Sequence, residues 1–397
     1  MLVYLVNIFA VCVWAMIFCT GKKHIAKRTI FVLICFAQCV LIAGNRYGIG
    51  ADYGMYASGF FDMARTGFEE LSYEDWEIGF ILLNKIVGKF TAWTSVFIMV
   101  SSVLSLIGPF YLIWRYSSGP FLSVFMFLNL YLFYLDLNYI RQGIAMSIMC
   151  FAYGFLRDKK FWRFLLVTAI AATFHLTVLY MIPVFIVALL KIRPQSMLLY
   201  LFGLLFYYIL SDGVLNILLS KFHTEYAGSV FIESGVYFYY ALFPLLLCAG
   251  MVVLSFYLKE IPRSLNVLMH MTLMMGFWQI VMTKHSLFER FSYYTMLFVI
   301  LAVPEALKAF RSQLKDNLRE KYLRQMGSDA EGSRALTRRV YSKTFTIMGF
   351  VYTAVMLLAL AYNLVGLIIP ESGVHGVLPY QTQNRMNIPN IDWFFKR

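Results

Sequence analysis

The sequence predicts an all-α polytopic membrane protein with about twelve transmembrane or half-membrane helices, both termini extracytoplasmic, and a broken helix pair near His175. Composition supports this class, since 60% of the 397 residues are hydrophobic and 14% are charged, against about 25% charged residues in a soluble domain. Lys and Arg stand in short blocks between apolar segments, as is typical of cytoplasmic loops. We therefore expect a single integral membrane domain over residues 1–397.

The formal net charge of +13 does not indicate nucleic-acid binding, which needs a solvated basic surface. Membrane orientation explains the charge, and membrane lipids are the expected surroundings. The six cysteines lie inside apolar segments, with no CxxC pair and no His at ligand spacing. The sequence therefore indicates neither a disulfide framework nor a zinc site.

Ten apolar runs predict membrane spans. They cover about residues 2–19, 29–45, 92–114, 120–136, 140–156, 196–211, 237–257, 264–283, 291–307 and 344–369. The first run has no basic segment before it and is followed by KKHIAKR. This order predicts an uncleaved span with its N-terminus outside rather than a signal peptide.

Two further apolar runs have an ambiguous length, because 78–90 is short for a span and 164–190 is long for one. We interpret 78–90 as a helix on the outer interface and 164–190 as two short helices that meet near His175. The predicted inner loops then hold 23 Lys and Arg against 7 Asp and Glu, and the outer segments hold 11 against 14. The positive-inside rule favours this solution over the alternative, in which 78–90 spans and 164–190 is one helix.

Four segments outside the spans are assigned by this topology. Residues 46–91 form an outer loop with an interfacial helix, rich in Gly and aromatic residues that suit a membrane interface or stacking on sugars. Residues 212–236 form a second outer loop, 308–343 a basic cytoplasmic helical loop, and 370–397 an outer C-terminal tail. No internal repeat is present, so the sequence does not indicate an inverted-repeat transporter.

Two polar residues lie among residues bound for lipid, namely Arg141 and His175. A charged group at the bilayer centre costs about 2.5 to 3.5 kcal/mol on insertion scales, so such residues usually face water or a partner. Both are functional-site candidates for this reason. The alternative is that Arg141 extends to a lipid headgroup and that His175 is a core residue with satisfied hydrogen bonds.

The chosen topology brings the candidate residues to one side of the membrane. The residues that emerge on the outer face are Arg46, Asp52, Arg141, His175, Glu289 and Arg290. The alternative topology scatters them over both faces. Their convergence is a second argument for the topology.

Three guanidinium groups on one face suit a lipid-linked diphosphate, because the fixed donors of arginine match phosphate oxygens. Arg46, Arg141 and Arg290 are the candidates for this role. His175 or Asp52 is the candidate general base toward a sugar hydroxyl, and arginine can stabilise a leaving diphosphate without a metal. The sequence has no DxD, HExxH or Walker motif, and we expect neither metal nor cofactor.

Each candidate also has a structural interpretation. Asp52 can pair with Arg46, and Glu289 can pair with Arg290 at a helix start, where a carboxylate favours the helix dipole. Tyr139 and the dense aromatic residues of the spans are typical of packing or of an interface belt.

Seven motifs in register resemble one known family. They are VYLVNIFAVCVW, NRYGIGADYGMY, EIGFILLNKI, NYIRQGIAMSI, TFHLTVLYMIPVFI, FERFSYYTMLFVILAVP and GVLPYQ. The chain resembles the EpsG family of bacterial exopolysaccharide and capsule polymerases, which is functionally akin to the Wzy O-antigen polymerases. The resemblance runs over about the whole chain.

This resemblance implies a multi-pass protein of the bacterial cytoplasmic membrane that moves a growing glycan from an undecaprenyl diphosphate carrier to a lipid-linked repeat unit outside the membrane. The implied partners are these lipid-linked oligosaccharides, with a chain-length regulator and a flippase as further candidates. The residues that match site residues of the family by motif are Arg46, Asp52, the Arg141–Gln142 pair, His175 and Arg290. We predict that Gln142, Glu289 and Tyr139 have supporting roles. Two departures are Ala51 in place of an expected Thr and a longer loop before the last span.

Two other functions remain open at the level of sequence. A membrane acyltransferase that modifies glycans would use His175 as base toward an acyl donor. A transporter or flippase of lipid-linked sugars would need polar residues along its whole path, and the inner halves of the predicted spans have almost none.

Overall fold

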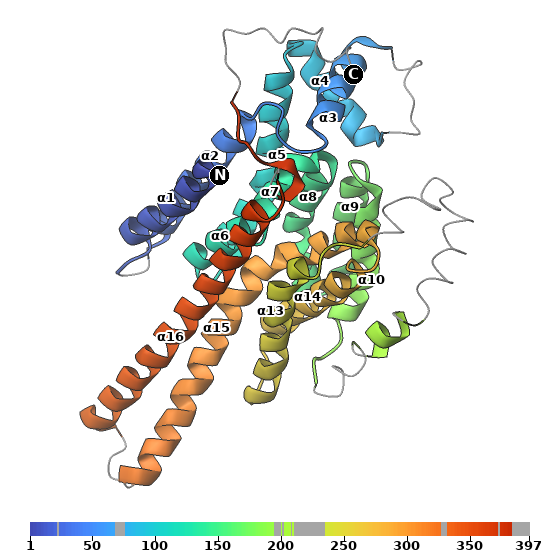
Figure 1. The fold of residues 1–397 in the computed structure, drawn as a ribbon. Coiled ribbons are helices and arrows are strands. Elements are labelled where there is room, and N and C mark those ends of the chain that lie inside the picture. The colour runs from blue at the N-terminus through green and yellow to red at the C-terminus, as the bar shows by residue number, and fades with distance from the viewer. Residues whose placement is uncertain are drawn as a thin grey trace. The chain divides into compact units, whose positions relative to one another are not determined.

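The computed structural model describes residues 1–21, 24–67, 76–193, 200, 202–207, 209, 235–326, 332–371 and 374–382 of the chain (Figure 1). Every regular element in these residues is a helix, and one isolated bridge joins Arg46 to Thr382. The prediction of an all-α protein is confirmed. Most of the predicted span 196–211 and loop 212–236 lies outside the described residues.

The chain divides into two compact units. The first contains Met1–Ile186 and Asn363–Arg397, and the second contains Val187–Tyr362. Each unit is built from helices that pack within it. The assignment of one integral membrane domain stays a prediction.

Most helices of the first unit follow the predicted apolar runs. The helices of this unit are α1 (Leu2–Phe18), α2 (Ile25–Gly44), α3 (Tyr53–Arg65), α4 (Ile78–Phe90), α5 (Thr94–Tyr116), α6 (Pro120–Asn129), α7 (Leu132–Asn138), α8 (Ile140–Arg157), α9 (Phe161–Ala172), the 3-10 turn η1 (Leu176–Tyr180), α10 (Met181–Ala188), which continues into the second unit, and the turn η4 (Val374–Gly376). Helix α3 is an additional helix within the predicted loop 46–91.

Local sequence explains several helix ends in this unit. The side chain of His24 accepts a hydrogen bond from the backbone N–H of Ala26 and caps α2. Pro120 stands at the start of α6, where its missing N–H costs nothing. Tyr131 has a left-handed φ of 63° and separates α6 from α7, which are bent by 52°. The break near His175 that the sequence predicts is present between α9 and η1.

Helix α5 packs against both α2 and α8 in the first unit. Close approach to α8 depends on Gly108, whose backbone N–H donates to Ser147 Oγ at 2.8 Å. A Cβ at Gly108 would lie 2.0 Å from the Ser147 carbonyl oxygen. Aromatic rings fill the space beside α3 and α4, where Phe60 stacks on Phe97 with 4.7 Å between ring centroids.

The second unit contains α13 (Tyr239–Tyr257), α14 (Arg263–Val281), the turn η2 (Ser286–Phe288), α15 (Glu289–Met326) and most of α16 (Arg334–Ile368). Helix α14 packs against α13 and α15. Helices α15 and α16 continue into the charged segment 308–343, where they cover most of the described residues. Its location in the cytoplasm stays a prediction.

Six helices of the described residues are long and apolar enough to cross a membrane, or seven if the bent pair α6 and α7 is one span. The chain is therefore a multi-pass membrane protein in class. The other apolar segments, α1, α9 and η1 with α10, are shorter than a complete crossing. The total of about twelve segments and the outer position of both termini stay predictions.

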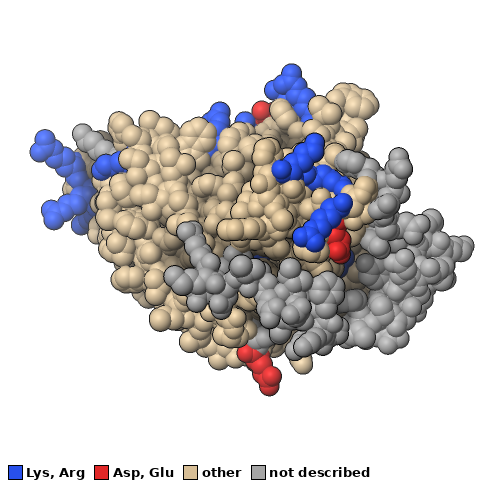
Figure 2. Space-filling view, turned by 90° about the horizontal axis from the view of Figure 1, so that it is seen from above, with Lys and Arg blue, Asp and Glu red and all other residues tan. Residues whose placement is uncertain are grey.

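Exposed side chains agree with a lipid environment. Figure 2 shows one face, on which uncharged side chains form most of the described surface. Large apolar residues on several helices are exposed, among them Phe9, Leu33, Trp162 and Phe350. A soluble monomer rarely exposes so much apolar surface.

We expect Gly108→Ala to destabilise the protein by about 1–3 kcal/mol, because the new methyl group forces α5 and α8 apart. The unfolding temperature of the purified protein in detergent, followed by tryptophan fluorescence, measures this. Gly349→Ala in α16 is the matched control, since no described atom lies within 4 Å of its Cβ position. An equal effect of both substitutions would contradict the assigned contact.

Candidate functional site

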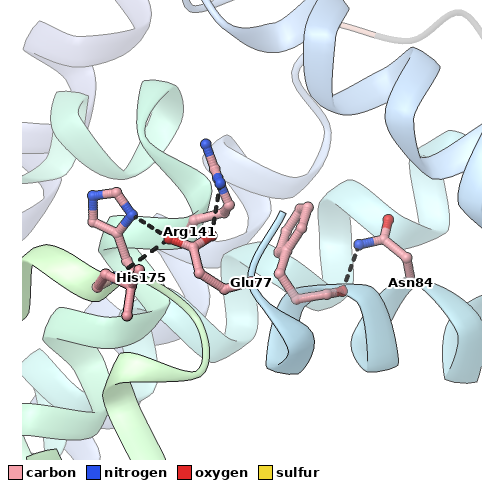
Figure 3. A network of polar contacts seen from close by, with 6 residues as sticks. Glu77, Asn84, Arg141 and His175 are labelled. Carbon is pink, nitrogen blue, oxygen red and sulfur yellow. Dashed lines mark hydrogen bonds and ion pairs between the residues drawn. The ribbon is translucent and has the colours of Figure 1, made fainter. Parts of the chain in front are cut away.

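The carboxylate of Glu77 joins two of the predicted site residues. Nη1 of Arg141 donates to Glu77 Oε2 at 2.6 Å, and Nδ1 of His175 lies 3.0 Å from Oε1 (Figure 3). The backbone N–H of Leu176 also donates to Oε1, at 3.3 Å. The structure thus brings Arg141 and His175 together on one acidic residue.

Three elements of the first unit supply these side chains. Glu77 immediately precedes α4, Arg141 is in the first turn of α8, and His175 lies in the extended gap between α9 and η1. The start of α4 is fixed to this gap, because the Gly79 N–H donates to the Thr173 carbonyl oxygen at 2.7 Å. A Cβ at Gly79 would lie 2.4 Å from Thr173 Oγ1. The glycine two residues after Glu77 therefore permits the close approach.

Two aromatic side chains from residues 46–91 contact Arg141. Its guanidinium lies 4.7 Å from the ring centroid of Trp76, a distance at which a cation is attracted to the ring face. Tyr56 on α3 is buried and forms a side-chain hydrogen bond with Arg141. The Trp76 ring also stacks on Phe80 of α4. These contacts fix the orientation of the guanidinium.

Electrostatics keep Glu77 ionised. Burial alone would raise its pKa, but the hydrogen bond with His175 and the charge of Arg141 outweigh burial and lower the pKa to about 2. An ionised carboxylate only accepts hydrogen bonds, so Nδ1 of His175 carries the shared proton. In the neutral imidazole Nε2 is then the basic nitrogen. The site is partly open, since the side chains of Arg141, Glu77 and His175 are 20%, 14% and 12% exposed.

Asp52 and Tyr139 lie in the same unit, next to this group. Asp52 precedes α3, and its backbone N–H donates to Asn138 Oδ1 at 2.9 Å. Its charge acts on Tyr56, the hydrogen-bond partner of Arg141. Tyr139 immediately precedes α8. Gln142, beside Arg141 in sequence, is buried.

Arg46 has a different environment. Its side chain is 0% exposed, and Nη1 donates to the Ala43 carbonyl oxygen at 2.5 Å and to Ser102 Oγ at 3.1 Å. The structure does not bring Arg46 to Glu77. Its role as a diphosphate ligand stays a prediction.

Glu289 and Arg290 start α15 and belong to the second unit. The Glu289 carboxylate accepts a hydrogen bond from the hydroxyl of Tyr293, one turn along the helix. The supporting role of Glu289 and the diphosphate role of Arg290 stay predictions. Within the described residues, no group of three or more His, Cys, Asp or Glu side chains is placed to hold a metal ion.

Three residues of this group were not predicted from the sequence, namely Glu77, Trp76 and Tyr56. The available signal was the acidic residue at the start of EIGFILLNKI, directly before a helix and two residues before a glycine. A carboxylate at this position favours the helix dipole. Its pairing with His175, 98 residues away, has no local signal.

Comparison with known proteins gives one match. The model of the EpsG family matches residues 29–319. No curated protein and no solved structure matches the chain. The matched stretch contains Glu77, Arg141 and His175.

We expect Glu77→Gln to lower the unfolding temperature, because the substitution removes the charge shared by Arg141 and His175. The Glu77 pKa is lower in the folded protein, about 2, than its ordinary value of 4.5. The stabilisation is therefore complete above about pH 4.5 and is lost as the pH falls toward 2. The difference in unfolding temperature between the two proteins should therefore be constant from pH 7 to about pH 4.5 and should narrow between pH 4.5 and pH 3. Glu260→Gln, at an exposed position, should differ little from the parent at any pH.

Proposed function

Since the chain belongs to the EpsG family, we propose that it is a polysaccharide polymerase of the bacterial cytoplasmic membrane. The proposed donor is a growing glycan on undecaprenyl diphosphate, and the acceptor is a sugar hydroxyl of a lipid-linked repeat unit. The reaction takes place on the outer side of a bundle of about twelve segments with both termini outside. A chain-length regulator and a flippase are the proposed protein partners.

The single observation that carries this proposal is the contact of Glu77 with both Arg141 and His175. It places a cation suited to phosphate oxygens beside an imidazole suited to a hydroxyl proton. Both side chains are partly exposed, which a lipid headgroup and its sugar require.

In the proposed step, the acceptor hydroxyl oxygen attacks the anomeric carbon of the donor sugar. The bond from this carbon to the diphosphate oxygen breaks, and the electron pair leaves with the carrier diphosphate. Arg141 stabilises the developing charge. Nε2 of His175 takes the hydroxyl proton, while Glu77 orients the ring and stabilises the imidazolium, as a carboxylate does in hydrolase triads.

Asp52 is the second candidate base. This role is supported by the electrostatic effect of Asp52 on Tyr56, which forms a hydrogen bond with Arg141. The two candidates differ in pH dependence, because a carboxylate keeps its basic form to lower pH than an imidazole. Arg46 is buried in this structure, and its proposed contribution to diphosphate binding is secondary to that of Arg141.

We expect the purified protein to lengthen lipid-linked repeat units without added metal or nucleotide sugar. Arg141→Ala and His175→Ala should each lower the elongation rate by a factor on the order of 100 or more, since each removes a group that acts on the transition state. Gel analysis of the glycan measures chain length. Mass spectrometry identifies an acyltransferase instead if the product keeps its length and carries an ester.

Matched controls come from the same unit. Arg157→Ala changes an arginine at the opposite end of α8, where its Nε lies 2.9 Å from Asp158. His24→Ala changes an exposed imidazole at the start of α2. Both should retain the parental rate. Elongation that survives Arg141→Ala and His175→Ala would refute the assigned roles.

A further inference from the structure

The C-terminal segment Val374–Thr382, here called the tail segment, lies along residues 46–51 of the same unit (Figure 1). The N–H groups of Gly50 and Ala51 donate to the carbonyl oxygens of Gly376 and His375 at 3.0 and 3.1 Å. The N–H of Tyr47 donates to Gln381 at 3.0 Å. The tail segment is therefore paired with the turn that leads to Asp52.

Two tyrosine hydroxyl groups link the tail segment to helices α1 and α2. The hydroxyl of Tyr4 on α1 donates to the Val377 carbonyl oxygen at 3.0 Å. The hydroxyl of Tyr380 donates to the Ile42 carbonyl oxygen at 2.7 Å, at the end of α2. Val377 is fully buried. These contacts make the tail segment part of the packed unit.

The backbone geometry at the contact favours glycine. Gly50 has a φ of 96°, and a Cβ there would lie 2.5 Å from the Leu137 carbonyl oxygen. Gly376 has a φ of 69°. His375, directly before Gly376, also has a left-handed φ, 57°. Among residues other than glycine, Asn, Asp and His adopt such a φ most often. An imidazole thus stands at a position where glycine fits more easily.

The imidazole of His375 contacts Tyr139, one of the residues predicted to support the site. Its ring lies 5.4 Å from that of Tyr139, edge to face. Tyr139 immediately precedes α8, which carries Arg141 in its first turn. Asp52 follows Ala51, which is bonded to the His375 backbone. His375 therefore lies among residues next to Asp52 and Tyr139, outside the family-matched stretch 29–319.

We propose that His375 is a substrate-binding residue that holds hydroxyl groups of the acceptor sugar, so that the tail segment completes the acceptor end of the site. This inference rests on the proposed function. An imidazole donates and accepts hydrogen bonds at the same time, which suits a sugar hydroxyl. The neighbouring aromatic ring of Tyr139 suits the apolar face of a sugar. The side chain is partly exposed, as contact with a ligand requires.

The test uses His375→Gly, because glycine adopts the left-handed conformation without strain and removes only the imidazole. The donor is lipid-linked oligosaccharide extracted from the cells that produce this protein. The acceptor is the same oligosaccharide after mild acid has released it from its diphosphate. Without the diphosphate leaving group, this oligosaccharide cannot act as donor. We expect the acceptor KM to rise about tenfold, as for one lost hydrogen bond, with the donor KM changed less than about twofold and an unfolding temperature no lower than that of the parent. His375→Asn, which tolerates the same φ and keeps a donor and an acceptor, should restore part of the loss.

Tyr380→Phe is the control for a purely structural role. It removes the hydroxyl bond to Ile42 and leaves the imidazole, so the unfolding temperature should fall and the acceptor KM should not change. A parental acceptor KM for His375→Gly, in an assay where the parent elongates, overturns the role of His375 alone. A rise in KM that Tyr380→Phe reproduces also overturns it. A parent that elongates nothing overturns the proposed function itself, and with it this inference.

Discussion

The contacts of the ionised Glu77 carboxylate with Arg141 and His175 are the interactions on which the first unit depends most. A positive charge in the first turn of a helix opposes the helix dipole, and Arg141 occupies this position in α8. Glu77 compensates that charge, and it stands itself at the start of α4, where the dipole favours a carboxylate. One acidic residue thus stabilises the beginnings of two helices and the break at His175.

The break near His175 has a structural cost that Glu77 also reduces. Backbone groups of a broken helix in an apolar protein need partners, because lipid offers none. Two such partners come from the start of α4, since Oε1 of Glu77 accepts from Leu176 N–H and Gly79 N–H donates to Thr173. The start of α4 therefore supplies both the hydrogen-bond partners for the break near His175 and the acidic residue Glu77. Structure and chemistry at this position depend on the same few contacts.

Sequence alone could predict the helical membrane class, most apolar segments and the break at His175, because these follow from composition, hydropathy and charge. It could also single out Arg141 and His175, because polar groups are costly in lipid. Glu77 was not predictable in this way. It lies in a loop where acidic residues are ordinary, and its partners are distant in sequence. The tail segment was assigned to the outer face, but its pairing with residues 46–51 depends on backbone hydrogen bonds that carry no sequence pattern.

Arg46 and Arg141 of the first unit have the same predicted role in diphosphate binding, but they differ in burial. Arg46 is fully enclosed, and its Nη1 donates to the Ala43 carbonyl oxygen and to Ser102 Oγ, so loss of these partners would leave a buried charge without hydrogen bonds. Arg141 is 20% exposed, and Glu77 balances it from one side. A guanidinium that is already paired with a carboxylate can bind a phosphate only through its remaining N–H groups, and partial exposure makes this possible. Access to solvent therefore distinguishes Arg141, the proposed phosphate ligand, from the enclosed Arg46.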